Sequence, residues 1–172
     1  MGSRFWTFSL SVYDNTAVQT ECLDLQDRYG IDVNLLLFCA YVGVVHRAIL
    51  SDSEVRQAAN VVGAWHKNIV RSLREARRAL KLFATEPSPI DSSAATLRAS
   101  VKTMELEAER LEQTMLEDWS ALRIDAWPRA QPTEAVVANI QKLFAICYGS
   151  AQQLDLPKHL IAAALAAARR QI

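Results

Sequence analysis

Apolar residues recur along most of the chain at spacings of three and four, the period of an amphipathic α-helix. Turn and cap residues divide this pattern into segments. For the first segment, 4–13, the alternation of Phe8-Ser9-Leu10-Ser11-Val12 leaves a short strand open as an alternative. The pattern predicts helices over residues 4–13, 16–29, 32–49, 51–84, 93–122, 133–148 and 157–170. We therefore expect an all-α fold: a single-domain bundle of about six or seven helices across residues 1–172.

The third segment is the most apolar part of the chain. Leu35 to Val45 is an unbroken apolar run of 11 residues, and a helix that is apolar on all sides has to be buried. A membrane span needs about 20 such residues, so the run predicts a buried central helix and no membrane span. Gly30 stands where a left-handed C-cap is expected for the preceding helix, and Asp32 where an N-cap is expected for this one.

The two longest segments predict an antiparallel helical hairpin over residues 51–122. Ser51 and Glu54 form a capping box at its start, and the loop 85–93, with Pro87 and Pro89, separates its two helices. The expected packing stripe of the first helix is Val55, Ala58, Ala59, Val62, Trp65, Ile69, Leu73, Ala76, Leu80 and Phe83. That of the second is Leu97, Val101, Met104, Leu106 (flanking), Ala108, Leu111, Met115, Leu116, Trp119 and Leu122.

Charge and cysteine usage narrow the class of protein. The chain has 19 basic and 19 acidic residues, and this zero net charge argues against a general nucleic-acid binder. The cysteines are odd in number, widely spaced and set in apolar surroundings, as in a reducing compartment. No signal peptide is visible at the start of the chain. We expect a cytoplasmic protein.

Three N-terminal motifs carry a family resemblance. They are Phe5-Trp6-Thr7-Phe8-Ser9-Leu10-Ser11-Val12-Tyr13, Cys22-Leu23-Asp24-Leu25-Gln26 and Gly30-Ile31-Asp32-Val33-Asn34-Leu35-Leu36-Leu37-Phe38. In them the chain resembles a family of small helical bacterial proteins of uncharacterised function. The close match covers about 40 residues, and Tyr41 stands near the position where the family pattern leads us to expect tryptophan. The resemblance implies a bacterial cytosolic origin and brings no established activity.

With this resemblance, the expected single domain has three parts. Residues 1–50 form the family-like N-terminal part, 51–122 the long helical hairpin and 123–172 the C-terminal helices.

The first candidate site is an acidic corner where the second predicted helix meets the third. It contains Asp24, Asp27, Asp32 and Asn34. Asp24 and Asp27 share a helix face, and Asn34 follows the Gly30 turn, so these groups could line a polar ligand pocket. Helix capping is the alternative, and we favour it because Asp before an apolar helix is the ordinary N-cap signal.

The second candidate site is a partner-binding surface. Arg71, Arg74, Arg78 and Lys81 follow helical spacing and form a basic stripe that could dock an acidic partner. The alternative is a solvated face paired with the acidic residues between Glu105 and Asp118, which we favour. Phe5 and Trp6 are a further partner-binding candidate, and core packing is their favoured alternative.

No catalytic constellation, phosphate-binding glycine loop or dinucleotide fingerprint is visible in the sequence. The three histidines lack a second ligand at metal-site spacing, so we expect no metal and no cofactor. These observations favour a non-enzymatic interaction or adaptor protein with a protein partner, and they leave a homo-oligomer open. The rival hypothesis is a ligand-binding or enzymatic bundle with its pocket at the corner Asp24–Asn34.

Overall fold

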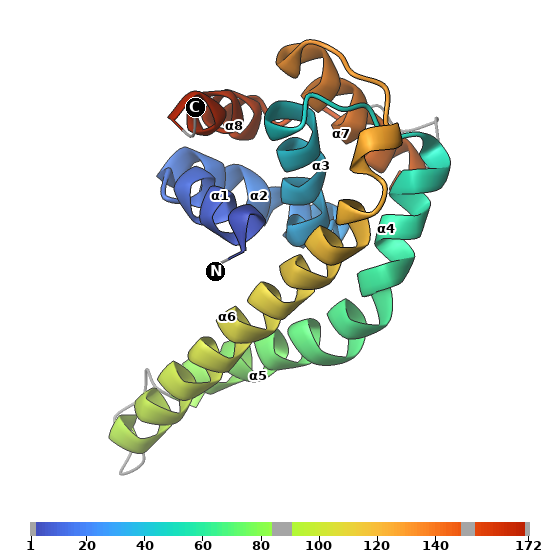
Figure 1. Cartoon of the computed structure of the whole chain (residues 1–172). Helices are drawn as coiled ribbons and strands as arrows, with labels where there is room; N and C mark the ends of the chain where they lie inside the picture. Colours follow the sequence, from blue (N-terminus) through green and yellow to red (C-terminus); the bar gives the residue numbers. More distant parts are fainter. Residues whose placement is uncertain (1–2, 84–90, 149–153, 171–172) are drawn as a thin grey trace. The chain divides into compact units, whose positions relative to one another are not determined.

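The structure, a computed structural model, describes residues 3–83, 91–148 and 154–170. Its helices are α1 (Arg4–Tyr13), α2 (Thr16–Tyr29), α3 (Val33–Val45), α4 (Asp52–Trp65), a π-helix (His66–Val70), α5 (Arg71–Phe83), α6 (Asp91–Ala121), a short 3₁₀ turn (Ile124–Ala126), α7 (Pro132–Tyr148) and α8 (Lys158–Arg170) (Figure 1). Because α4, the π-helix and α5 are contiguous, the α segments make seven continuous helices in the described part. The predicted all-α fold is confirmed, and residues 4–13 are helical.

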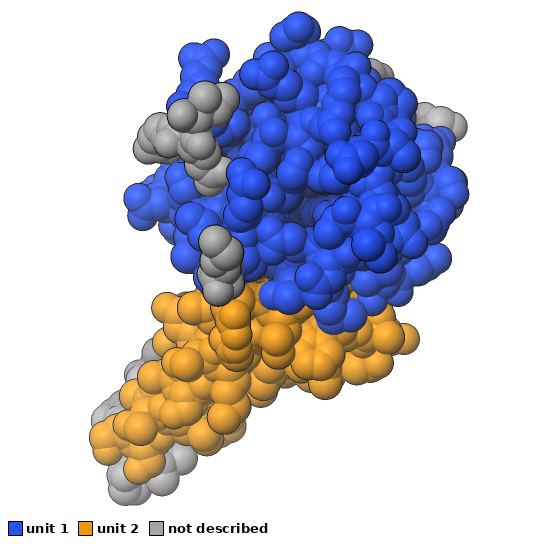
Figure 2. All heavy atoms as spheres, in the orientation of Figure 1, with its two compact units in different colours: residues 1–61, 113–172 blue, residues 62–112 orange. Residues whose placement is uncertain are grey.

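The described residues divide into two compact units (Figure 2). We call residues 1–61 and 113–172 the core unit, and residues 62–112 the hairpin unit. The division into parts 1–50, 51–122 and 123–172 stays a prediction. Most of the predicted loop 85–93 lies outside the described residues.

In the core unit, α3 is the buried central helix that the apolar run predicts. Its residues from Asn34 to Val44 are all buried. It packs against α7 and α8 and also contacts α1 and α2, which surround it in Figure 1. The approach to α7 is close, because a Cβ added at Gly43 would lie 2.6 Å from the backbone of Val136. This spacing explains a glycine inside a buried helix.

The predicted end of the central helix at Ile49 is wrong, since α3 stops at Val45. Arg47 has a positive φ of 52°, which turns the chain out of the helix. The chain then forms a short antiparallel bridge in which Ile49 N–H donates to the Pro128 carbonyl at 2.9 Å and Ala130 N–H donates to the Arg47 carbonyl at 2.8 Å. These partners lie far along the chain, so the local apolar pattern could not reveal them.

Two helices of the core unit begin on carboxylates supplied from elsewhere in the sequence. The Glu21 carboxylate accepts hydrogen bonds from the backbone N–H groups of His159 and Leu160 at the start of α8. The Glu117 carboxylate accepts from Phe5 N–H at the start of α1, at 3.1 Å. A negative group at a helix N-terminus satisfies free N–H donors and favours the helix dipole.

The hairpin unit contains the antiparallel arrangement expected from the two long segments. Trp65 Nε1 donates to the Ala108 carbonyl at 3.0 Å, and Arg74 Nε donates to the Glu105 carboxylate at 3.1 Å. Contacts therefore move back along α6 as they move forward from the end of α4 to α5. Across the described residues, no helix is long and apolar enough to cross a membrane.

Candidate functional site

At the acidic corner, Asp32 is the N-cap of α3. Its carboxylate accepts hydrogen bonds from the backbone N–H groups of Asn34, at 2.9 Å, and Leu35, at 3.3 Å. Gly30 ends α2 with a φ of 67°, the left-handed conformation that a C-cap glycine supplies. Both residues serve the helix ends that the sequence pattern assigns to them.

The other members of the acidic corner have different environments. Asp24 is exposed and accepts a hydrogen bond from Arg28 of the same helix at 3.1 Å, and Asp27 is also exposed. Asn34 is buried, and its side-chain oxygen accepts from Gln113 Nε2 at 2.8 Å. Two exposed carboxylates and a buried amide do not share one enclosed environment, so this geometry gives the pocket hypothesis little support.

A buried amide that the sequence analysis did not single out organises the loop after α3. Asn139 of α7 is fully buried, and its Nδ2 donates to the carbonyls of Cys39 and Ala48 at 3.3 and 3.0 Å. Its Oδ1 accepts from Leu50 N–H at 2.8 Å. One side chain therefore makes hydrogen bonds to three backbone groups, and two of these, at Ala48 and Leu50, lie outside the helices. Its signal in the sequence is weak, a polar residue on the apolar side of a predicted helix.

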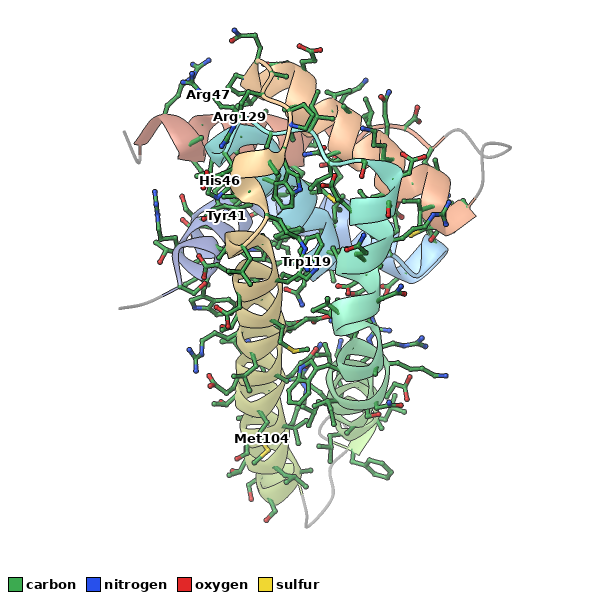
Figure 3. The ribbon with its side chains drawn as sticks, turned by 45° about the vertical axis from the view of Figure 1, so that its right-hand side comes forward. Tyr41, His46, Arg47, Met104, Trp119 and Arg129 are labelled. Atoms are coloured by element: carbon green, nitrogen blue, oxygen red, sulfur yellow. The ribbon has the colours of Figure 1, made fainter. Side chains whose placement is uncertain are left out.

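The C-terminal end of α3 gathers aromatic and basic side chains, several of which are labelled in Figure 3. The rings of Tyr41 and His46 are 4.9 Å apart, and the Arg129 guanidinium donates to the His46 carbonyl. Burial lowers the pKa of His46 to about 4, and the positive charges of Arg4 and Arg129 contribute to this shift. His46 is therefore neutral at physiological pH.

The aromatic N-terminal candidates divide between interior and surface. Phe5 is fully buried, with its ring stacked on Tyr41 at 5.0 Å and edge-on to Phe38 at 5.7 Å. Trp6 is only partly buried. Core packing, the favoured alternative in the sequence analysis, describes the surroundings of Phe5.

The members of the predicted basic stripe lie in two different environments. Arg74 is turned toward α6, where it donates to Glu105 and, at 2.9 Å, to Glu109. Arg71, Arg78 and Lys81 are exposed, and Arg71 lies 4.0 Å from Glu75 of the same helix. One member of the stripe thus helps to hold the hairpin together, and three remain at the surface.

Glu105 is the centre of the polar contact inside the hairpin unit. It is buried, and both Arg74 and Arg77 donate hydrogen bonds to its carboxylate. Burial alone would raise the pKa of Glu105, but the hydrogen bonds and charges of Arg77 and Arg74 outweigh burial and lower it. In the same unit, His66 Nδ1 lies 3.0 Å from a carboxylate oxygen of the buried Glu112, at the start of the π-helix.

An apolar surface on the hairpin unit was not expected from the sequence. Phe83, Leu97 and Met104 are 58%, 53% and 60% exposed, and Ile69 and Leu111 are also exposed. All five belong to the predicted packing stripes of the hairpin, as do the exposed Leu106 and Leu122, and the packing prediction is wrong for these seven residues. On each hairpin helix, the apolar stripe is wider than the surface that the other hairpin helix covers. We define the apolar face as Ile69, Ala76, Phe83, Leu97, Met104 and Leu111.

The members of the apolar face follow one another at intervals of seven residues, about two turns of α-helix: Ile69 in the π-helix, Ala76 and Phe83 in α5, and Leu97, Met104 and Leu111 in α6. Around α5 the order is Ala76, then Arg77, then Arg74; around α6 it is Met104, then Glu105, then Glu109. The rotational order is therefore the same on both helices. First comes the apolar residue, then the member of the Arg77–Glu105 pair, and then the member of the Arg74–Glu109 pair. Because the helices are antiparallel, this order places both apolar stripes on one side of the hairpin and the ion pairs on the other.

Comparison with known proteins gives a family and no assigned chemistry. A family described as proteins of unknown function, DUF2390, matches residues 4–116. No curated protein and no solved structure matches the chain. The matched residues include α1 to α5 and most of α6, so they contain the hairpin unit and its apolar face. The chain belongs to the DUF2390 family of proteins of unknown function.

Proposed function

We propose that this protein is a non-enzymatic interaction protein of the bacterial cytosol that binds a helical protein surface through the apolar face. The observation that carries the proposal is the exposure of large apolar side chains in a regular pattern on both helices of one unit. Scattered exposed apolar residues are normal, whereas aligned ones mark interaction sites.

The pattern favours a helix as the binding partner. Residues spaced by seven on each of two adjacent helices leave a shallow groove between two apolar ridges. An amphipathic helix can place its own ridge in such a groove, as in helix-in-groove recognition. All members of the apolar face, including Ala76, Leu97 and Met104, are uncharged, and this favours an apolar contact over a charged one.

The bacterial and cytosolic parts of the proposal rest on the sequence. The N-terminal motifs resemble a bacterial family, and the three cysteines are of the kind found in reducing compartments. Two cysteines are buried and unpaired, and burial with the Glu21 charge raises the pKa of Cys22 to about 12. Such a thiol packs as a small apolar side chain and is a poor nucleophile.

The proposal is tested by recovery of bound proteins from the source cells with tagged wild-type protein and two variants. Met104→Glu places a charge on the apolar face. Lys102→Glu is the matched control, because residue 102 is exposed and lies about 200° round the same helix from Met104. We expect Lys102→Glu to recover the same proteins as the wild type. We expect the amount of these proteins recovered with Met104→Glu to be at least tenfold lower. Equal recovery by all three would contradict the proposal.

A further inference from the structure

The apolar face matches a second copy of itself, and we propose that two chains pair through it to form an antiparallel four-helix bundle. This inference rests on the proposed function, since it names the partner of the same surface. It assigns one arrangement: α5 of each chain lies over α6 of the other, and the two-fold axis runs parallel to the helices.

The positions of the residues along the hairpin axis support pairing of the apolar face with the apolar face of a second copy. Inside one chain, His66 contacts Glu112 and Arg77 contacts Glu105. In an antiparallel pair, a step forward on one helix is a step back on the other. Three pairs of the apolar face are therefore level with each other: Phe83 with Leu97, Ala76 with Met104, and Ile69 with Leu111.

A two-fold axis parallel to the helices leaves each residue of the second copy at the same position along the helix axis as in the first copy. Phe83 then meets Leu97 of the second copy, Ile69 meets Leu111, and the small Ala76 meets the long Met104. Each contact occurs twice, as a closed symmetric interface requires. Small and large side chains opposite each other let two apolar surfaces interdigitate. The face extends from Ile69 to Phe83, about 21 Å of helix at about 1.5 Å per residue.

The charges of the two helices select this arrangement over the other symmetric one. The basic residues of α5 are Arg71, Arg74, Arg77, Arg78 and Lys81, against the single acidic residue Glu75. The C-terminal part of α6 in this unit carries Glu105, Glu107, Glu109 and Glu112, against Arg110. An axis perpendicular to the helices would place the basic α5 over a second α5. An axis parallel to them places it over the acidic α6. Because Arg74 and Arg77 already pair with Glu105 and Glu109 inside the chain, this charge matching acts at long range and selects orientation more than it adds stability.

The oligomeric state of the full chain is the first test. Sedimentation velocity over a wide range of protein concentration is expected to show a dimer for the wild type and for Lys102→Glu, and a monomer for Met104→Glu. Leu97→Glu is a second variant on the same face, and circular dichroism checks that each variant is folded. A wild-type monomer at every concentration would overturn the inference. If the wild type is a monomer but Met104→Glu still loses recovered proteins, the proposed function stands and the second copy is not its partner.

Cross-linking tests the arrangement. In a Cys147→Ser background, which removes the exposed native thiol, Ala76→Cys and Met104→Cys are made as separate single variants. A short thiol cross-linker should join them when they are mixed, and should join either variant to itself much less. The matched control, Ala76→Cys mixed with Lys102→Cys, should give no enrichment. Efficient cross-linking of Ala76→Cys to itself would overturn the proposed axis.

Discussion

His46, at the end of α3, has surroundings that oppose its protonation. Burial lowers its pKa to about 4, and the charges of Arg4 and Arg129 act in the same direction. In the unfolded chain its pKa is about 6.5. The unfolded state therefore binds more protons between about pH 4 and pH 6.5. The contribution of His46 to stability is complete above this range and is lost as the pH falls through it.

We predict that His46→Gln reduces the acid sensitivity of folding. The free energy of unfolding of the wild type should fall by about 1 kcal/mol more than that of the variant between pH 7 and pH 5, a value reduced for the partial exposure of the ring. Urea unfolding at the two pH values measures the difference. Equal losses in the two proteins would show that His46 titrates normally in the folded state.

Asn139 is a buried polar residue of the core unit whose replacement should be strongly destabilising. Asn139→Leu removes three hydrogen bonds and leaves Leu50 N–H and the Ala48 carbonyl buried without this partner. We predict a loss of about 2–4 kcal/mol in the free energy of unfolding, measured with urea. Gln141→Leu, at an exposed position of the same helix, should change it by less than about 0.5 kcal/mol. A comparable effect of both changes would contradict the role given to Asn139.

The sequence predicted single residues well where their partners are local. The Asp32 cap, the Gly30 turn and the capping box of Ser51 and Glu54 each act within a few residues, and each is present. Asn139 and the carboxylate caps were missed because their partners lie about 90 to 140 residues away. Local pattern holds no information about such pairs.

Among the elements, the hairpin depends on the contact of Glu105 with two arginines. Glu105→Gln removes the charge that Arg74 and Arg77 share. We predict a loss of about 1–3 kcal/mol in the free energy of unfolding, because hydrogen bonds to charged groups carry about that much. Glu107→Gln is the control, because Glu107 is exposed and forms an ion pair with Arg110 of the same helix. Thermal unfolding that shifts equally in both variants would contradict this account.

The position and type of the elements were predictable from periodicity, and some boundaries and faces were not. The apolar run continues to Ile49, but a bridge to residues 128–130 ends α3 at Val45. The packing stripes showed which residues are apolar. They did not show that α5 and α6 cover only part of each other's stripe, which depends on how the two helices are rotated about their axes.

On the scale of the whole molecule, the sequence predicted the all-α class, and its zero net charge argued against a general nucleic-acid binder. It did not predict the division into two compact units or the apolar face. Both depend on contacts between segments distant in sequence. We therefore propose that the function lies on the hairpin unit, because apolar residues from Ile69 to Leu111 are aligned and exposed there.

Methyl NMR of methionine tests this central claim most directly. Met104 is on the apolar face, and Met115, partly buried in the core unit, is an internal control. The Met104→Glu variant assigns the Met104 signal. As protein concentration rises, the account predicts that the Met104 methyl signal shifts or broadens while the Met115 signal stays constant. A Met104 signal that is unchanged from low to high concentration would contradict pairing through the apolar face.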